Sequence, residues 1–171
     1  MERKYKVFIT GVGGFLGHHL AVRMNELGYE VAGNDTFVGG EEDNVPDFVD
    51  FSLVDCCDFK GMEKAMEGCD LLYHCAATAH EGLSVFSPSF ITRNIFEASV
   101  TSFSAAISAG VKRIVFCTSM ARYGNQAAPF TEDMQPQPVD PYGIAKVASE
   151  EVLKVLGKVH QVEWNIAVPH N

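Results

Sequence analysis

The chain has 171 residues, 47% of them apolar, which suits one well-cored domain and excludes a disordered chain or two domains of ordinary size. Its formal net charge of −9 comes without a basic cluster, which argues against a nucleic-acid partner. Because no apolar stretch approaches the length of a membrane span and the N-terminus has no secretory pattern, we expect a cytoplasmic protein with no membrane partner.

Short apolar runs alternate with segments of helical periodicity along the chain. The apolar runs predict strands at 6–10, 30–34, 48–51, 70–75, 113–118 and 163–168. The segments between them predict helices at 14–27, 59–67 and 88–109, and a fourth at 141–157 that Pro141 opens. Three prolines between residues 127 and 140 predict a loop there.

This alternation is typical of an α/β fold with a parallel sheet. Right-handed crossovers make a doubly wound sheet with helices on both faces the expected arrangement. The chain ends directly after the last predicted strand, with no helix to cover that edge. We therefore expect residues 1–171 to be one domain that is truncated at its C-terminal end.

The five cysteines contain no Cys-x-x-Cys spacing, so neither a disulfide framework nor a metal site is predicted. Cys75 and Cys117 lie at the ends of two predicted strands, where small buried side chains are needed. We expect both to be inert thiols of the core.

Three glycines, Gly11, Gly14 and Gly17, follow the first predicted strand. Their Gly-x-x-Gly-x-x-Gly spacing has one residue more than the usual dinucleotide fingerprint, yet it meets the same physical demands. These are a tight turn, close approach of the backbone to a pyrophosphate, and a helix N-terminus whose N–H groups attract anions. The alternative is a turn whose glycines serve only tight packing.

Asp35 stands at the end of the second predicted strand, where a dinucleotide-binding sheet delivers a carboxylate to the adenosine ribose. A carboxylate repels a 2′-phosphate, and no arginine lies within residues 34–44. The sequence therefore favours NAD over NADP as the cofactor. The alternative is an aspartate that only stabilises a turn.

Tyr142 and Lys146 form a Tyr-x-x-x-Lys pair in the last predicted helix. A spacing of four puts both side chains on one helix face, where an ammonium favours the ionised form of a phenol. A phenol with a lowered pKa can transfer protons near neutral pH. Taken alone, the pair is also compatible with a surface Tyr/Lys contact.

Together these motifs resemble the short-chain dehydrogenase/reductase superfamily, and within it the NAD-dependent epimerases and dehydratases that act on nucleotide sugars. The resemblance spans essentially the whole chain. Beyond the glycine turn and the Tyr/Lys pair it is carried by residues 55–58 (Asp-Cys-Cys-Asp), residues 74–77 (His-Cys-Ala-Ala), Asn94 and residues 118–124, which are similar to Ser-Ser-x-x-x-Tyr-Gly. It implies a Rossmann fold with NAD as cofactor.

The resemblance also implies roles for individual residues. Tyr142 is the expected catalytic acid/base, Lys146 its electrostatic partner and ribose ligand, and Ser119 the hydroxyl that hydrogen-bonds the substrate. The implied cofactor contacts are Gly11, Gly14, Phe15, Leu16, Gly17, Asp35, Asp55, Cys56, Ala76, Ala77, Asn94, Tyr142, Lys146 and Pro169. His74 and His80 are assigned no role, and a homodimer through the helices at 88–109 and 141–157 is implied as a possible assembly.

The residues after Ser119 bear on the reaction. Dehydratases of the family place Asp-Glu there, whereas this chain has Met120 and Ala121. Without these carboxylates, a keto intermediate that stays bound is expected to be reduced again from its other face. Epimerisation of a nucleotide sugar, most simply at C4, is therefore the leading expectation. The alternatives are an NAD-dependent reductase or dehydrogenase of the same family, and a cofactor-binding fragment without turnover, because the family's C-terminal substrate domain is absent.

Overall fold

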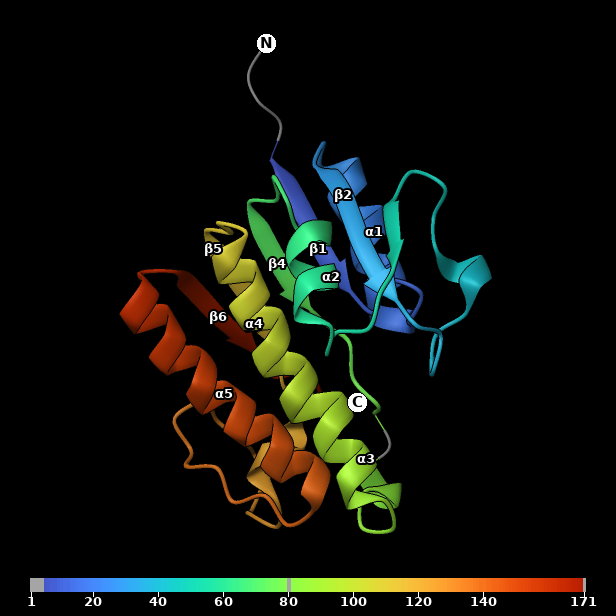
Figure 1. Cartoon of the computed structure of the whole chain (residues 1–171). Coiled ribbons are helices and arrows are strands. Elements are labelled where there is room, and N and C mark those ends of the chain that lie inside the picture. Colours follow the sequence, from blue (N-terminus) through green and yellow to red (C-terminus); the bar gives the residue numbers. More distant parts are fainter. Residues whose placement is uncertain (1–4, 80, 171) are drawn as a thin grey trace.

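A six-stranded parallel sheet forms the centre of the computed structural model, which describes residues 5–79 and 81–170 (Figure 1). The strand order is β3-β2-β1-β4-β5-β6. The strands are β1 (Lys6–Thr10), β2 (Glu30–Asp35), β3 (Asp50–Leu53), β4 (Leu71–His74), β5 (Arg113–Cys117) and β6 (Glu163–Ala167).

Helices cover both faces of this sheet, as predicted. Figure 1 shows α2, α4 and α5 in front of the sheet and α1 behind it. The α-helices are α1 (Phe15–Glu26), α2 (Phe59–Ala65), α3 (Pro88–Thr92), α4 (Ala98–Ser108) and α5 (Pro141–His160). Short 3₁₀ turns lie at η1 (Glu42–Asn44), η2 (Glu81–Leu83) and η4 (Met120–Tyr123), and η3 (Arg93–Glu97) is a π-helical turn.

The central strand β1 supplies both layers of the core. Val7 and Ile9 pack with Ala21 of α1 on one face, whereas Phe8 packs with Phe103 of α4 on the other. Successive side chains of a strand point to opposite faces, so an unbroken apolar run is what a strand covered on both sides requires. The predicted doubly wound α/β sheet is confirmed.

Two predicted elements differ from the structure. The strand predicted at 48–51 lies at Asp50–Leu53, because pairing with β2 sets its bounds, and Val49 is buried in the core just before the strand begins. The single helix predicted at 88–109 is α3 and α4 joined by the π turn Arg93–Glu97. Its buried face is nevertheless continuous, with Ile91, Ile95 and Phe103 inside.

No helix in the described part of the chain is both long and apolar enough to cross a lipid bilayer. Within the same residues, no group of three or more His, Cys, Asp or Glu side chains is placed to hold a metal ion.

Candidate active site

A cavity of about 440 Å³ opens at the carboxyl ends of β1, β2 and β4. The strand order reverses between β1 and β4, and such a switch point leaves a crevice in a doubly wound sheet. The cavity is lined by Gly11, Gly14, Asn34, Asp35, Thr36, Val38, Gly39, Gly40, Asp55, Cys56, Cys75, Ala76, Ala77, Thr78, Ala79, Phe90, Asn94 and Ala98. Eight predicted cofactor residues are among them: Gly11, Gly14, Asp35, Asp55, Cys56, Ala76, Ala77 and Asn94.

The glycine turn at one end of the cavity has no room for side chains. Gly11 has φ +71°, and a Cβ there would lie 2.9 Å from the Cα of Ala76. A Cβ on Gly17 would overlap the carbonyl oxygen of Gly11. The N-terminus of α1 therefore opens directly on the cavity, and its first N–H groups, which have no acceptor within the helix, suit a pyrophosphate.

Six predicted cofactor residues do not line the cavity: Phe15, Leu16, Gly17, Tyr142, Lys146 and Pro169. Phe15 and Leu16, in the first turn of α1, have side chains that are 81% and 45% exposed, so only their backbone N–H groups face the anion site that the helix end offers. Pro169 is exposed in the segment after β6.

Asp35 ends β2 at the rim of the cavity. Its Oδ2 accepts a hydrogen bond from the N–H of Gly13 at 2.9 Å, and its Oδ1 accepts from Thr36 and Phe37 at 2.8 Å each. The carboxylate thus stabilises its own turn, as the alternative interpretation expected, and it also joins that turn to the glycine loop. Its contact with a ribose stays a prediction.

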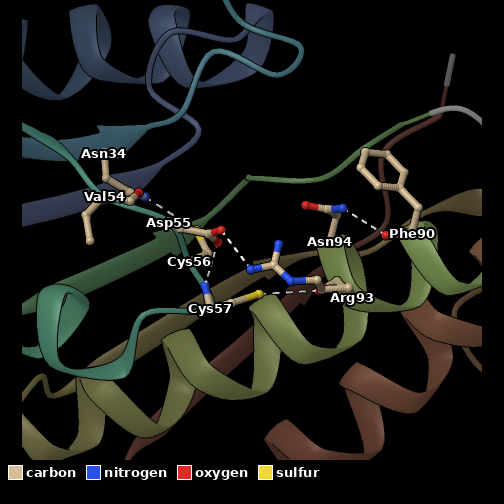
Figure 2. Close-up of polar contacts among 8 residues, drawn as sticks. All are labelled: Asn34, Val54, Asp55, Cys56, Cys57, Phe90, Arg93 and Asn94. Carbon is tan, nitrogen blue, oxygen red and sulfur yellow. Dashed lines mark hydrogen bonds and ion pairs between the residues drawn. The ribbon is translucent and has the colours of Figure 1, made fainter.

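Asp55, two residues after the end of β3, also lines the cavity and lies beside the π turn (Figure 2). It accepts the N–H of Cys57 at 2.8 Å and pairs with Nη2 of Arg93 at 3.0 Å. Burial raises the pKa of this carboxyl, but the Cys57 N–H and Arg93 outweigh burial and lower the pKa overall. Arg93 escaped the sequence analysis because no motif marks an arginine that pairs across 38 residues.

Asn94 projects from the π turn into the cavity wall (Figure 2). Its Nδ2 donates to the carbonyl oxygen of Phe90 at 2.8 Å, which fixes the amide. Single π turns within α-helices occur often at functional sites, since the extra residue redirects a side chain. Neighbouring Cys56 is buried, and its Sγ accepts from Nδ2 of Asn34 at 3.4 Å.

His74 holds the strand end that carries Ala76 and Ala77. Its ring contacts the hydroxyls of Thr10 at 2.8 Å and Ser99 at 3.0 Å, and complete burial lowers its pKa to about 3. The Thr10 hydroxyl also accepts the N–H groups of Cys75 and Ala76, each at 3.1 Å. His74, which was assigned no catalytic role, is thus a packed histidine of the core, whereas His80 lies outside the described residues.

Tyr142 and Lys146 lie in the first turns of α5, which Pro141 opens and Asp140 caps by accepting the N–H of Gly143 at 2.9 Å. Both side chains are buried, with 7% and 2% of their surface exposed. The Nζ of Lys146 donates to the carbonyl oxygen of Cys117 at 2.8 Å and lies 6.0 Å from the centre of the Tyr142 ring. Burial lowers the pKa of Lys146 to about 8.

The phenol of Tyr142 differs from expectation. Burial raises its pKa, a hydrogen bond with Ser119 opposes this effect, and the nearby carboxylates of Glu81 and Asp140 add to it. The expectation that Lys146 lowers this pKa is therefore wrong for the structure without cofactor, because desolvation of the ring region dominates. This hydrogen bond brings Ser119, the N-cap of η4, beside Tyr142, and the role of Ser119 toward a substrate stays a prediction.

Tyr142 connects the trio of Ser119, Tyr142 and Lys146 to the cavity. It packs with Ile91, Ile95 and Ala145 in a small apolar cluster against which Ala77 also packs. Ala77 lines the cavity. Tyr142, Ser119 and Lys146 therefore lie beside the cavity that Asp35 and Asp55 line.

A buried ion pair behind the trio was missed by the sequence analysis. Glu150, 1% exposed at its side chain, pairs through Oε2 with Nη2 of Arg122 at 3.2 Å and accepts the hydroxyl of Thr118. These contacts tie α5 to the segment that flanks Ser119. Glu150 follows Lys146 by four residues, and this spacing was the available signal for a shared helix face.

The chain's similarity to known proteins agrees with this geometry. The profile of the NAD dependent epimerase/dehydratase family matches residues 7–171. A UDP-glucose 4-epimerase of Streptomyces lividans is 30% identical over 169 residues, which are 96% of this chain and 51% of that protein.

Solved structures agree as well. The UDP-glucose 4-epimerase of Brucella ovis in complex with NAD has a TM-score of 0.91 at 26% identity, over 96% of this chain and 51% of that one. The UDP-glucose 4-epimerase of Thermotoga maritima with UDP-glucose has a TM-score of 0.90 at 26% identity. The match covers 94% of this chain and 54% of that one. The chain thus spans about half the length of the relatives that it matches.

Proposed function

The chain belongs to the NAD-dependent epimerase/dehydratase family, and we propose that it carries the NAD-binding and acid/base part of a nucleotide-sugar 4-epimerase. The observation that carries this proposal is the meeting of Ser119, Tyr142 and Lys146 beside the glycine-lined cavity. The trio offers a proton acceptor, a hydroxyl donor and a cation within one buried cluster.

The cavity residues suit NAD. The close approach of Gly11 to Ala76 and the N-terminus of α1 leave a backbone-lined site for a pyrophosphate. The Asp35 carboxylate, already oriented by three N–H groups, is proposed to accept the adenosine ribose hydroxyls. When bound, NAD supplies reversible hydride transfer at its nicotinamide ring.

The proposed chemistry begins with a sugar hydroxyl. Tyr142 takes the proton of the C4 hydroxyl as the carbon loses its hydride, and a transient 4-keto sugar results. The Ser119 hydroxyl orients the reacting oxygen, and its hydrogen bond with Tyr142 favours the tyrosinate, while the buried Lys146 is the proposed ribose ligand. Tyr142 then returns the proton after hydride has been delivered to the other face of the ketone, which inverts C4.

The turn after Ser119 supports epimerisation over elimination. Met120 and the buried Ala121 occupy the two positions where dehydratases of the family carry carboxylates. Ala121 contributes only its N–H, which donates to Ser119 Oγ at 3.2 Å. Without an acid or base at this turn, a ketone formed beside Tyr142 is set up for renewed reduction rather than loss of water.

Two further expectations stay predictions, namely a cytoplasmic location and a homodimer through the helices at 88–109 and 141–157. The apolar residues Ile144, Val155 and Val159 of α5 are 55%, 61% and 68% exposed, which supports an interface on that helix.

An exchange assay tests the proposal. The chain is supplied with NAD and UDP-glucose, and the formation of UDP-galactose is followed together with absorbance of NADH. We expect isomer exchange without net NADH, and a decrease of about 100-fold or more in Tyr142→Phe with NAD binding retained. Net NADH would favour the dehydrogenase alternative, and NAD binding without exchange would favour a fragment that does not turn over. Unchanged exchange in Tyr142→Phe would remove that residue from the mechanism.

A further inference from the structure

Cys75 and Cys117 lie opposite each other at the carboxyl ends of two adjacent strands. The last paired residues of β4 and β5 are His74 and Phe116, so the two cysteines are the next pair in the same register. Their sulfur atoms are 3.6 Å apart. The two cysteines, which the sequence analysis expects to be inert thiols of the core, are half-buried and in mutual contact.

The strand geometry is compatible with a bond between these two sulfurs. Adjacent strands lie about 4.8 Å apart, and Cα atoms joined by a disulfide are usually about 4.4 to 6.8 Å apart. The sulfurs can therefore reach bonding distance by side-chain rotation, without separation or sliding of β4 and β5.

The surroundings make one of the two thiols acidic. A hydrogen bond with Cys75 lowers the pKa of Cys117 to about 7, and the buried Lys146 ammonium acts in the same direction against the effect of burial. Burial raises the pKa of Cys56, of Cys57 to about 12 and of Cys69 to about 11. Because the thiolate is the reacting form, Cys117 is the favoured nucleophile of the chain.

The pair can also be reached from outside. Cys75 lines the cavity at the end of β4, and Cys117 is half-buried rather than enclosed. Cys56 and Cys69, in contrast, are buried in the core. A small disulfide reagent that enters the cavity therefore meets Cys75, whose sulfur is in contact with that of Cys117.

We propose that Cys75 and Cys117 form a dithiol modification site, which a low-molecular-weight disulfide of the glutathione class converts into an intramolecular disulfide. The Cys117 thiolate attacks one sulfur of the reagent, whose S–S bond breaks and releases one thiolate. Cys75 then attacks the sulfur of Cys117 in this mixed disulfide and releases the second thiolate. Two electrons pass to the reagent, and the two protons of the cysteines leave with its two thiols.

The disulfide would join two parts of the candidate active site. Cys75 directly precedes Ala76 and Ala77 in the cavity wall, and the Cys117 carbonyl accepts the hydrogen bond of Lys146. The site nevertheless stands without the proposed function, because its formation requires neither cofactor nor turnover.

Mass spectrometry of the oxidised chain tests the proposal. The reduced chain is incubated with oxidised glutathione, the remaining thiols are alkylated in denaturant, and the product is digested. We expect the loss of two of the five thiols, an intact mass lower by two hydrogens, and a linked peptide pair that contains Cys75 and Cys117. Five thiols still free, glutathione adducts without a link, or a link between other cysteines would overturn the proposal.

Single-cysteine variants sharpen the same measurement. Cys75→Ser lacks the second thiol and is expected to trap glutathione on Cys117, whereas Cys117→Ser is expected to form no linked peptide. The matched control is Cys57→Ser, which removes another half-buried thiol and should form the same link as the parent chain. Loss of the link in this control would contradict the assignment, and the peptide map of the parent chain decides the question even where a variant fails to fold.

Discussion

Gly17 lies where the first turn of α1 passes closest to the loop after β1. A Cβ at this position would overlap the Gly11 carbonyl oxygen, so the helix must move away from the loop to accept any side chain. We expect Gly17→Ala to lower the free energy of unfolding by roughly 1–3 kcal/mol, the usual effect of overpacking. Urea unfolding measures this change.

The matched control for that substitution is Gly82→Ala. A Cβ on Gly82 meets no atom within 4 Å. The free energy of unfolding of the Gly82→Ala variant should stay within about 0.5 kcal/mol of the parent value, as for most surface substitutions. Equal effects of the two substitutions would show that the close contact of α1 with the loop does not govern stability.

Lys146 gives the free energy of unfolding a pH dependence with a definite sign. Burial lowers its pKa from the ordinary 10.5 to about 8 in the folded chain. Between pH 8 and pH 10.5, Lys146 holds its proton more often in the unfolded chain than in the folded chain. Lys146 therefore makes the free energy of unfolding rise with pH. Relative to Lys146→Met, the parent chain should gain on the order of 1 kcal/mol between pH 7 and pH 9.

This difference is measured by urea unfolding of both proteins at the two pH values. Lys154→Met, which removes a more exposed lysine of the same helix, serves as the control and should follow the parent chain. A parent chain and a Lys146→Met variant that change equally with pH would mean that Lys146 has an ordinary pKa.

At the scale of elements, α5 and the η4 turn are joined by one buried ion pair. Glu150→Gln removes the charge that faces Arg122, whose side chain is only 9% exposed. A buried charge that loses its partner destabilises a fold by about 3–5 kcal/mol. We expect a loss of this size by urea or thermal unfolding.

The neighbouring Glu151→Gln is the matched control. Glu151 pairs with Lys154 on the exposed side of the same helix, where an ion pair contributes about 0.3–0.5 kcal/mol. Replacement of the buried pair by apolar side chains in Glu150→Leu/Arg122→Met should recover much of the stability. If Glu150→Gln behaves like Glu151→Gln, the buried pair does not hold α5 against η4.

The elements themselves were largely predictable, because strands covered on both faces and amphipathic helices leave clear apolar patterns. The pattern predicted β1 with the observed bounds, and it predicted the start of α5 through Pro141. It failed for β3, whose bounds depend on pairing with β2. The π turn at Arg93–Glu97 was also missed, since it leaves the buried face of the helix unchanged.

The site was predictable where spacing encodes geometry. Gly11, Gly14 and the Tyr142/Lys146 pair depend on local turns and one helix face, and the structure brings them to the cavity or beside it. Contacts across the sheet left no such signal. The Asp55–Arg93 pair and the Cys75–Cys117 contact each join residues about 40 positions apart, and only the packing of α3, η3 and the strand ends brings them together.

At the scale of the whole molecule, the sheet ends, the glycine turn, Asp35 and Asp55 line one cavity, the proposed NAD site, in a chain that spans about half the length of its relatives. We propose that Asp35 decides which dinucleotide suits this site. Its carboxylate would meet the 2′-phosphate of NADP at the end of β2, and no arginine lies within residues 34–44 to offset the repulsion.

Calorimetric titration of the chain with NAD and NADP in parallel tests the central claim most directly. We predict that NAD binds and that NADP binds at least about tenfold more weakly, a difference of roughly 1.4 kcal/mol. Binding of NADP as tightly as NAD, or no binding of either, would contradict the assignment of the cavity between Gly11 and Asp35 as an NAD site.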